Sequence, residues 1–246
     1  MNGWFADGAG ARYDESTGPY FEPETIEATV DFLEPLAANG ALELAIGTGR
    51  IAVPLAARGV RVAGIDYSLP MVEQLRKKTD AIPVEVGDYS TTSVDGTFSV
   101  VYLVFNGINN QTTQAAQVAA FANAAAHLAP GGCFVIEVGT PPDRAWTVFD
   151  LSDTHVGIDE YDAYTQRLVS HHFGLRGDHW KLRSGEFRAV STAELDLMAR
   201  LAGLELRERW ADWDRSPFTA ESTKHVSVWE KLSLRIELPI ETERAE

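Results

Sequence analysis

The stretch ALELAIGTGRIAVPLA, residues 41–56, decides the fold of this chain. A short apolar run leads into the glycine turn GTGR, and Ile51, Ala52 and Leu55 follow at the spacing of one helix face. Glycines let the backbone turn tightly and approach a ligand closely, and the helix that follows presents free amide groups to that ligand. The stretch therefore predicts a strand, a ligand-binding turn and a helix.

Apolar runs and helical patterns alternate on both sides of this stretch. Such alternation is typical of a parallel sheet covered by helices, that is, of a doubly wound α/β fold. The run FSVVYLVF is apolar throughout, as expected for a strand with both faces covered. The predicted strands are 41–46, 60–66, 82–88, 98–105, 133–138, 204–210 and 225–231, and the predicted helices begin near Pro23, Ile51, Ser68, Thr113 and Ser191.

The alternation stops between Thr140 and Val190. Three strand-like runs, 155–161, 165–173 and 179–190, follow one another with no helical pattern between them. They predict an antiparallel β meander inserted into a Rossmann-like, seven-stranded sheet. The expected parts are an N-terminal lid segment (1–22), an α/β domain (23–140 and 191–232), the β insertion over the site (141–190) and a C-terminal tail (233–246).

Composition narrows the class of protein. Lys and Arg number 21 against 36 Asp and Glu, and the formal charge of −15 would repel nucleic-acid phosphates, so no nucleic-acid partner is expected. The chain has no long uncharged apolar stretch and no secretory pattern at its start, so no membrane partner is expected. The single cysteine, Cys133, lies in the apolar run CFVIEV and predicts a buried thiol in a reducing, cytoplasmic compartment.

The glycine turn alone leaves two cofactor classes open. Gly47, Gly49 and Ala52 also fit G-x-G-x-x-A, the fingerprint of nicotinamide dinucleotide binding. Asp66 ends the second predicted strand, where an acidic side chain accepts both hydroxyls of a ribose. An NAD(P)-dependent oxidoreductase is therefore an alternative, although the chain offers no evident catalytic Tyr-Lys pair and Asp88 would have no role.

Five segments together resemble the class I S-adenosylmethionine-dependent methyltransferases, in particular the small-molecule enzymes of the methyltransferase-domain family. The segments occur in the family's order and span most of residues 23–138. They are LELAIGTGRIAVPLA, VAGIDYSLPMVEQLRKK, VEVGDYS, VYLVFNGINN and LAPGGCFVIEV. The resemblance implies an antiparallel last strand and S-adenosyl-L-methionine as the cofactor.

The resemblance also implies a set of cofactor-binding residues. The glycine turn would cradle the methionine part, with Ala45 where many members have glycine, and Asp66 would hold the ribose. Side chains after the second and third strands would surround the adenine, and Phe105 with Asn106 would face the sulfonium and the acceptor. The full set is Glu43, Ala45, Gly47, Gly49, Asp66, Tyr67, Met71, Asp88, Tyr89, Phe105 and Asn106.

Catalytic residues are harder to assign, because methyl transfer needs alignment in a dry pocket more than stabilisation of new charge. Aromatic faces suit a cationic sulfur, so Tyr13, Tyr20 and Phe105 are candidates, although ordinary packing explains the two tyrosines equally well. His171 and His172 are candidate bases, but neighbours on a strand point to opposite faces, so at most one reaches the pocket. The histidines show no recurring ligand spacing, and no metal is expected.

The sequence thus predicts direct in-line methyl transfer to N, O or C of a small-molecule acceptor. The resemblance in layout to that family implies an amino sugar nucleotide or another secondary metabolite as the acceptor. A non-catalytic S-adenosylmethionine-binding protein is a second alternative, and a homodimer stays open. The segment WADWDR, residues 210–215, is more typical of a packed loop with solvated charges than of a substrate-reading cluster.

Overall fold

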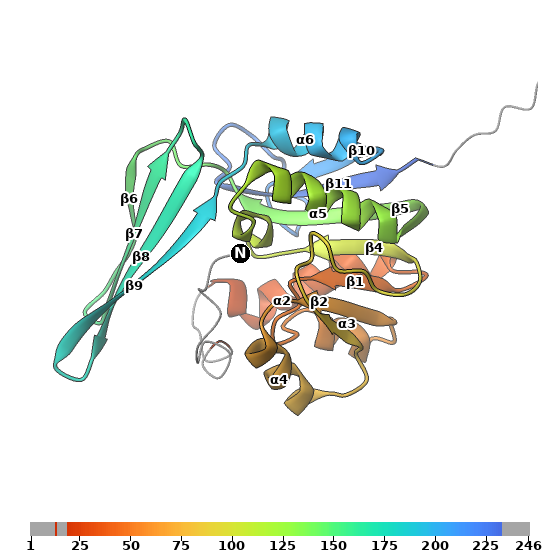
Figure 1. The fold of residues 1–246 in the computed structure, drawn as a ribbon, viewed down its shortest axis with the longest axis horizontal. Coiled ribbons are helices and arrows are strands. Elements are labelled where there is room, and N and C mark those ends of the chain that lie inside the picture. Colours follow the sequence, from red (N-terminus) through yellow and green to blue (C-terminus); the bar gives the residue numbers. More distant parts are fainter. Residues whose placement is uncertain (1–12, 14–18, 233–246) are drawn as a thin grey trace, which may run out of the picture.

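The protein consists of a seven-stranded sheet with helices on both faces and a four-stranded antiparallel sheet at one end of it (Figure 1). The structure, a computed structural model, describes residue 13 and residues 19–232. The predicted doubly wound sheet with an inserted β meander is confirmed. The main-sheet strands, in spatial order, are β10 (Leu204–Trp210), β11 (Lys224–Lys231), β5 (Leu128–Gly139), β4 (Phe98–Leu103), β1 (Ala41–Leu44), β2 (Val62–Asp66) and β3 (Val84–Val86).

Strand direction places the site. β1 pairs in parallel with β2 and β4, and β11 is antiparallel to both of its neighbours, β5 and β10. The antiparallel last strand implied by the resemblance is therefore present. Because β1 to β5 all run the same way, the loops that follow them meet at one edge of the sheet, which is where ligands bind in open α/β folds.

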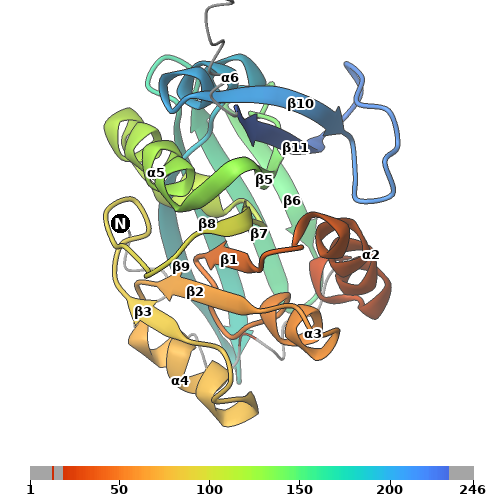
Figure 2. The same cartoon turned by 90° about the vertical axis from the view of Figure 1, so that its right-hand side faces the viewer.

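The helices bury two separate cores. They are α2 (Pro23–Leu33), α3 (Ala52–Ala57), α4 (Leu69–Lys78), α5 (Gln114–His127) and α6 (Thr192–Leu201). On one face, Phe121 of α5 packs edge-on against Phe134 and Trp229 of the sheet. On the other face, α2 and α3 pack against the sheet, as Figure 2 shows. None of the helices in the described part of the chain is long and apolar enough to cross a membrane.

Side chains cap the starts of two helices. The hydroxyl of Thr113 accepts a hydrogen bond from the backbone N–H of Ala116, and that of Ser191 accepts one from Glu194. Ser68 precedes α4 as predicted, but its side chain makes no capping hydrogen bond.

The inserted sheet, called sheet B below, contains one strand more than the sequence predicts. Its strands are β6 (Trp146–Leu151), β7 (His155–Asp162), β8 (Arg167–Arg176) and β9 (His179–Arg188), in that spatial order. The pattern of β6 hides it, because a register shift between Val148 and Asp150 breaks the alternation of side chains. In Figure 1 sheet B stands beside the end of the main sheet at which β5 leads into β6.

Candidate cofactor and acceptor site

The glycine turn after β1 has a backbone shape that favours glycine. Gly47 and Gly49 have φ of 58° and 78°, and Ala45 has φ of 56°. A Cβ atom added to Gly49 would lie 2.7 Å from Cδ1 of Leu75 on α4. Gly49 is therefore required by its backbone angle and by close packing, whereas Ala45 holds a conformation that disfavours an L-residue by roughly 1–2 kcal/mol.

Asp66, the last residue of β2, is tied to this turn. Its Oδ2 accepts a 2.7 Å hydrogen bond from the backbone N–H of Gly47, and its Oδ1 accepts one of 2.7 Å from Ser68. Burial raises the pKa of this carboxyl, while the two amide donors act to lower it. Each carboxylate oxygen has a second lone pair, so Asp66 can accept ribose hydroxyls while it holds the turn. The ribose role of Asp66 stays a prediction.

Glu43 of β1 lies buried among neighbours of both charges. Its Oε2 accepts a 2.9 Å hydrogen bond from the hydroxyl of Tyr102. Burial raises the pKa of Glu43 to about 8, and the Tyr102 hydrogen bond and the positive charge of Arg50 oppose that rise. Burial therefore favours the protonated form of this carboxyl at neutral pH.

The residues implied for the adenine side divide between surface and core. The ring of Tyr67 is 60% exposed, and Met71 is buried with its Cε beside Gly47. Asp88 accepts hydrogen bonds at Oδ1 from the backbone of Ser90 and from the amide of Gln111. Tyr89 is packed in the core, and its hydroxyl donates to the carbonyl of Gly107.

Aromatic rings gather where β4 ends. The Tyr20 and Phe105 ring centroids lie 4.4 Å apart, and those of Phe21 and Phe105 lie 5.9 Å apart. We call Tyr20, Phe21 and Phe105 the aromatic wall. Arg50, at the end of the glycine turn, donates a 2.6 Å hydrogen bond to the carbonyl of Tyr20 and lies 5.5 Å from the Phe105 centroid. Tyr13 packs edge-on against Phe21. Both candidate tyrosines, Tyr13 and Tyr20, therefore lie near Phe105, which is predicted to face the sulfonium.

Tyr20 is a hydrogen-bonding phenol at neutral pH. Burial raises the pKa of Tyr20 to about 12, and the negative charge of Glu137 adds to the rise. The side chain of Asn106 hydrogen-bonds with the phenol and lowers its pKa in part. Tyr20 is therefore suited to orient a ligand, and it is a poor base.

Glu137 of β5 is a residue that the sequence did not single out. Its Oε2 accepts a 3.0 Å hydrogen bond from the backbone N–H of Phe105, and its Oε1 accepts one of 3.0 Å from the indole of Trp213. The side chain is buried, and burial raises its pKa. A signal was present in CFVIEV, because one carboxylate inside an apolar strand requires specific partners.

The loop between β10 and β11 supplies part of the same region. Trp213 is buried, as expected for a packed loop, and Asp212 binds the ammonium of Lys224 at 2.8 Å. That ammonium lies 5.5 Å from the centroid of Tyr20. The predicted packed loop thus also brings charged groups beside the aromatic wall.

The two candidate histidines point to opposite faces of sheet B. His171 hydrogen-bonds with the hydroxyl of Ser184 at 2.8 Å, whereas His172 lies 3.0 Å from His155. Burial and the neighbouring His155 lower the pKa of His172 to about 4, so its ring is neutral at physiological pH. These contacts join both rings to sheet B rather than to the aromatic wall. Among the described residues, no group of His, Cys, Asp and Glu could hold a metal ion.

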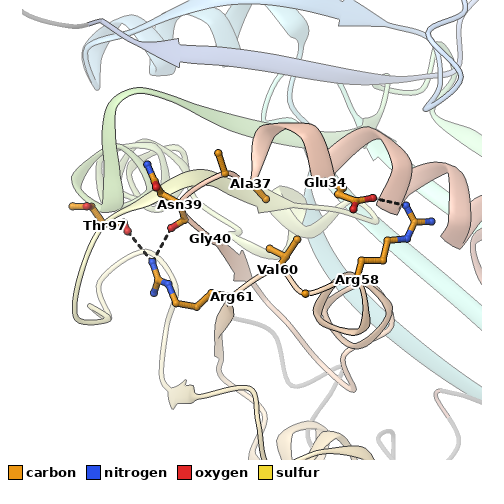
Figure 3. Close-up of a pocket in the computed structure, with 10 residues that line it drawn as sticks. Glu34, Ala37, Asn39, Gly40, Arg58, Val60, Arg61 and Thr97 are labelled. Carbon is orange, nitrogen blue, oxygen red and sulfur yellow. Dashed lines mark hydrogen bonds and ion pairs between the residues drawn. The ribbon is translucent and has the colours of Figure 1, made fainter.

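A hollow of about 570 Å³ lies at the opposite edge of the sheet, among loops that precede β1, β2 and β4 (Figure 3). Its two arginines are already paired. Arg58 binds Glu34 at 2.7 Å, and Arg61 donates to the carbonyls of Asn39 and Thr97. We therefore place the functional site at the carboxyl edge.

The order of the strands separates this fold from the dinucleotide-binding one. A Rossmann sheet ends in parallel strands, whereas here an antiparallel strand, β11, lies between β5 and β10. Together with the acid that ends β2, this arrangement defines the class I methyltransferase architecture.

Comparison with known proteins gives the family. The family model described as "Methyltransferase domain" matches residues 41–132. The chain is 31% identical to the cypemycin N-terminal methyltransferase of a Streptomyces species, over 83% of this chain and 88% of that protein. It belongs to the S-adenosylmethionine-dependent methyltransferases, and its cofactor is S-adenosyl-L-methionine.

Solved structures agree with this assignment. The CcbJ methyltransferase from Streptomyces caelestis is 34% identical, with a TM-score of 0.84 over 94% of this chain and 98% of that one. CalS10, an amino pentose methyltransferase from Micromonospora echinaspora solved with S-adenosylmethionine, is 20% identical, with a TM-score of 0.67 over 90% of this chain and 94% of its own. The second likeness concerns the fold alone. An NAD(P)-dependent oxidoreductase is not favoured.

Proposed function

We propose that this protein transfers the methyl group of S-adenosylmethionine to a nitrogen atom of a small-molecule acceptor. When bound, the cofactor supplies an electrophilic methyl on a sulfonium, and the sulfur leaves as a neutral thioether. The observation that carries the proposal is the aromatic wall beside the glycine turn, whose Tyr20 keeps its proton to about pH 12.

The wall supports alignment rather than proton removal. Aromatic faces attract a cation, so Tyr20 and Phe105 suit the surroundings of a sulfonium. An alcohol must lose a proton to attack, which calls for a base, whereas a neutral amine attacks with its lone pair and releases a proton to water only after the transfer. Tyr20 is a poor base, and the pKa of His172 is lowered to about 4. An amine acceptor is therefore the better match.

The relatives support the same acceptor atom. One is named for the N-terminus that it methylates, and a neighbour in structure is named an amino pentose methyltransferase. An amine-bearing secondary metabolite, such as an amino sugar nucleotide, is thus the acceptor class we propose. Direct in-line transfer within one complex is the mechanism we propose.

Calorimetry of cofactor binding tests the site. Replacing Asp66 with Ala removes the carboxylate that would hold the ribose, and we expect affinity for S-adenosylmethionine to fall by about 1–3 kcal/mol. Glu73→Ala is the matched control, because it removes the same charge from an exposed position of α4. An unchanged affinity in Asp66→Ala would exclude the ribose role.

A turnover screen tests the acceptor. Pairs of acceptors that differ only by an amine or a hydroxyl at one carbon are offered with S-adenosylmethionine, and S-adenosylhomocysteine is measured. We expect product with the amines only. Product with the hydroxyl members alone contradicts transfer to nitrogen, and saturable cofactor binding without any product favours a non-catalytic binding protein.

A further inference from the structure

We propose that Glu137 is a positioning residue of the methyl-transfer site, which holds Phe105, and through it the aromatic wall, in place against the cofactor. This inference rests on the proposed function.

The backbone that Glu137 holds is unusual. Phe105 and Asn106 follow one another with φ of 52° and 58°, a conformation that few residues other than glycine adopt. Two such residues in succession persist only where the surroundings fix them. The segment therefore requires an external constraint.

Residues at the end of β5 supply that constraint. Glu137 binds the N–H of Phe105 through Oε2, and its own carbonyl accepts a 3.1 Å hydrogen bond from the N–H of Asn106. The N–H of Gly139 then donates a 2.7 Å hydrogen bond to Oδ1 of Asn106. One strand thus holds both left-handed residues, and only the bond to Phe105 depends on the Glu137 side chain.

The remaining contacts keep the carboxylate in one orientation. Its Oε1 accepts from Trp213 and lies 3.8 Å from the ammonium of Lys224. Arg50 adds a second positive charge near the carboxylate, and Glu137 is only 2% exposed. A buried carboxylate with its oxygens aimed at fixed donors has little freedom to move, so it can serve as a rigid support.

The consequence for function lies in the ring of Phe105. Its centroid is 4.4 Å from that of Tyr20 and 5.5 Å from the Arg50 guanidinium. If the Phe105 backbone relaxes out of the left-handed region, its ring leaves these partners. Small misplacements of an aligning group lower rates strongly. We therefore expect binding of the cationic sulfonium part of the cofactor to weaken more than binding of its neutral parts.

The test compares ligands that differ at the reacting centre. S-adenosylhomocysteine lacks the methyl and the positive charge, while sinefungin carries an amine near that position, and neither requires an acceptor. In Glu137→Leu, which removes both acceptor oxygens at similar volume, we expect at least tenfold weaker binding of S-adenosylmethionine and sinefungin. Affinity for S-adenosylhomocysteine should change less than threefold.

Two further variants separate positioning from general damage. Trp213→Phe removes the indole N–H that donates to Oε1 of Glu137 and leaves the hydrogen bond to Phe105. It should therefore lower the melting temperature without changing the ratio of the affinity for S-adenosylmethionine to the affinity for S-adenosylhomocysteine, called the ratio below. Glu137→Gln keeps one acceptor oxygen for Phe105 and should restore part of the ratio. Should Glu137→Leu not fold, Glu137→Met, which likewise has no acceptor oxygen, takes its place, and a ratio in Glu137→Met equal to that in Trp213→Phe overturns the proposal.

A double-mutant cycle excludes a direct effect of charge. If Glu137 acts through Phe105, the change in ratio caused by Glu137→Leu disappears in a Phe105→Ala background. The same change in both backgrounds means that the carboxylate acts by charge alone, and the proposal fails. Lack of S-adenosylmethionine binding by the unmodified protein would instead remove the proposed function.

Discussion

The turn after β1 and the turn after β4 both adopt left-handed backbone angles, but different contacts stabilise them. Both pass through left-handed backbone angles at the carboxyl edge of the sheet, with φ of 56° at Ala45 and 58° at Asn106. The first turn draws its shape from its own glycines, Gly47 and Gly49. The second contains no glycine at its two left-handed positions and is held by β5. The first turn therefore depends mainly on its own glycines, with one hydrogen bond from Gly47 to Asp66 of β2, whereas the second depends on hydrogen bonds to β5.

The largest expected effect tests how strictly the first turn depends on its own residues. In Gly49→Ala the new Cβ lies 2.7 Å from Leu75 and 2.9 Å from Val53, at φ of 78°. Backbone strain and overpacking together should lower the free energy of unfolding by roughly 2–5 kcal/mol. Denaturant unfolding measures the change.

Gly59→Ala provides the matched control for that variant. Gly59 has φ of 88°, but a Cβ there would meet nothing within 4 Å. Only the backbone term remains, so the expected loss is about 1–2 kcal/mol. Equal losses in the two variants would show that packing against Leu75 and Val53 adds nothing to the requirement for Gly49.

The next effect tests whether the second turn depends on a side chain. Asn106→Gly relieves the left-handed strain but removes the oxygen that accepts the N–H of Gly139 at 2.7 Å. An unpartnered donor in this partly buried site outweighs the relief, and we expect a net loss of roughly 1–2 kcal/mol in unfolding free energy. A more stable glycine variant would mean that the second turn is as local as the first.

The same contrast explains what the sequence could predict. The glycine turn, the place of Asp66 at the end of the second strand and the positions of the main-sheet strands follow from residues close together in the chain, and the structure has them in the expected elements. Glu137 acts on Phe105 across 32 residues, and nothing near Phe105 in the sequence indicates it. The sequence does not predict strand β6 for a related reason, since its shape depends on pairing with β7 rather than on its own pattern.

The buried acid Glu43, which lies on β1 before the first turn, should make the free energy of unfolding depend on pH. The pKa of Glu43 rises from about 4.5 when unfolded to about 8 in the fold. Between these values the folded chain keeps a proton that the unfolded chain has released, so stability falls as pH rises. Relative to Glu43→Gln, the protein should lose about 1 kcal/mol of unfolding free energy from pH 7 to pH 8. A difference that stays constant with pH contradicts the raised pKa.

The smallest expected effect has the opposite sign to that of Asn106→Gly, although the backbone angles nearly match. Ala45 has φ of 56°, and a residue without a Cβ has no penalty there. Against this gain stands the larger loss of chain entropy that glycine undergoes on folding, so Ala45→Gly should raise the unfolding free energy by only about 0.5–1 kcal/mol. Denaturant unfolding of the two glycine variants side by side decides the matter. Stabilisation at Ala45 with destabilisation at Asn106 means that side-chain contacts, and not backbone angle, distinguish the two turns, whereas a shared sign would make the backbone angle sufficient.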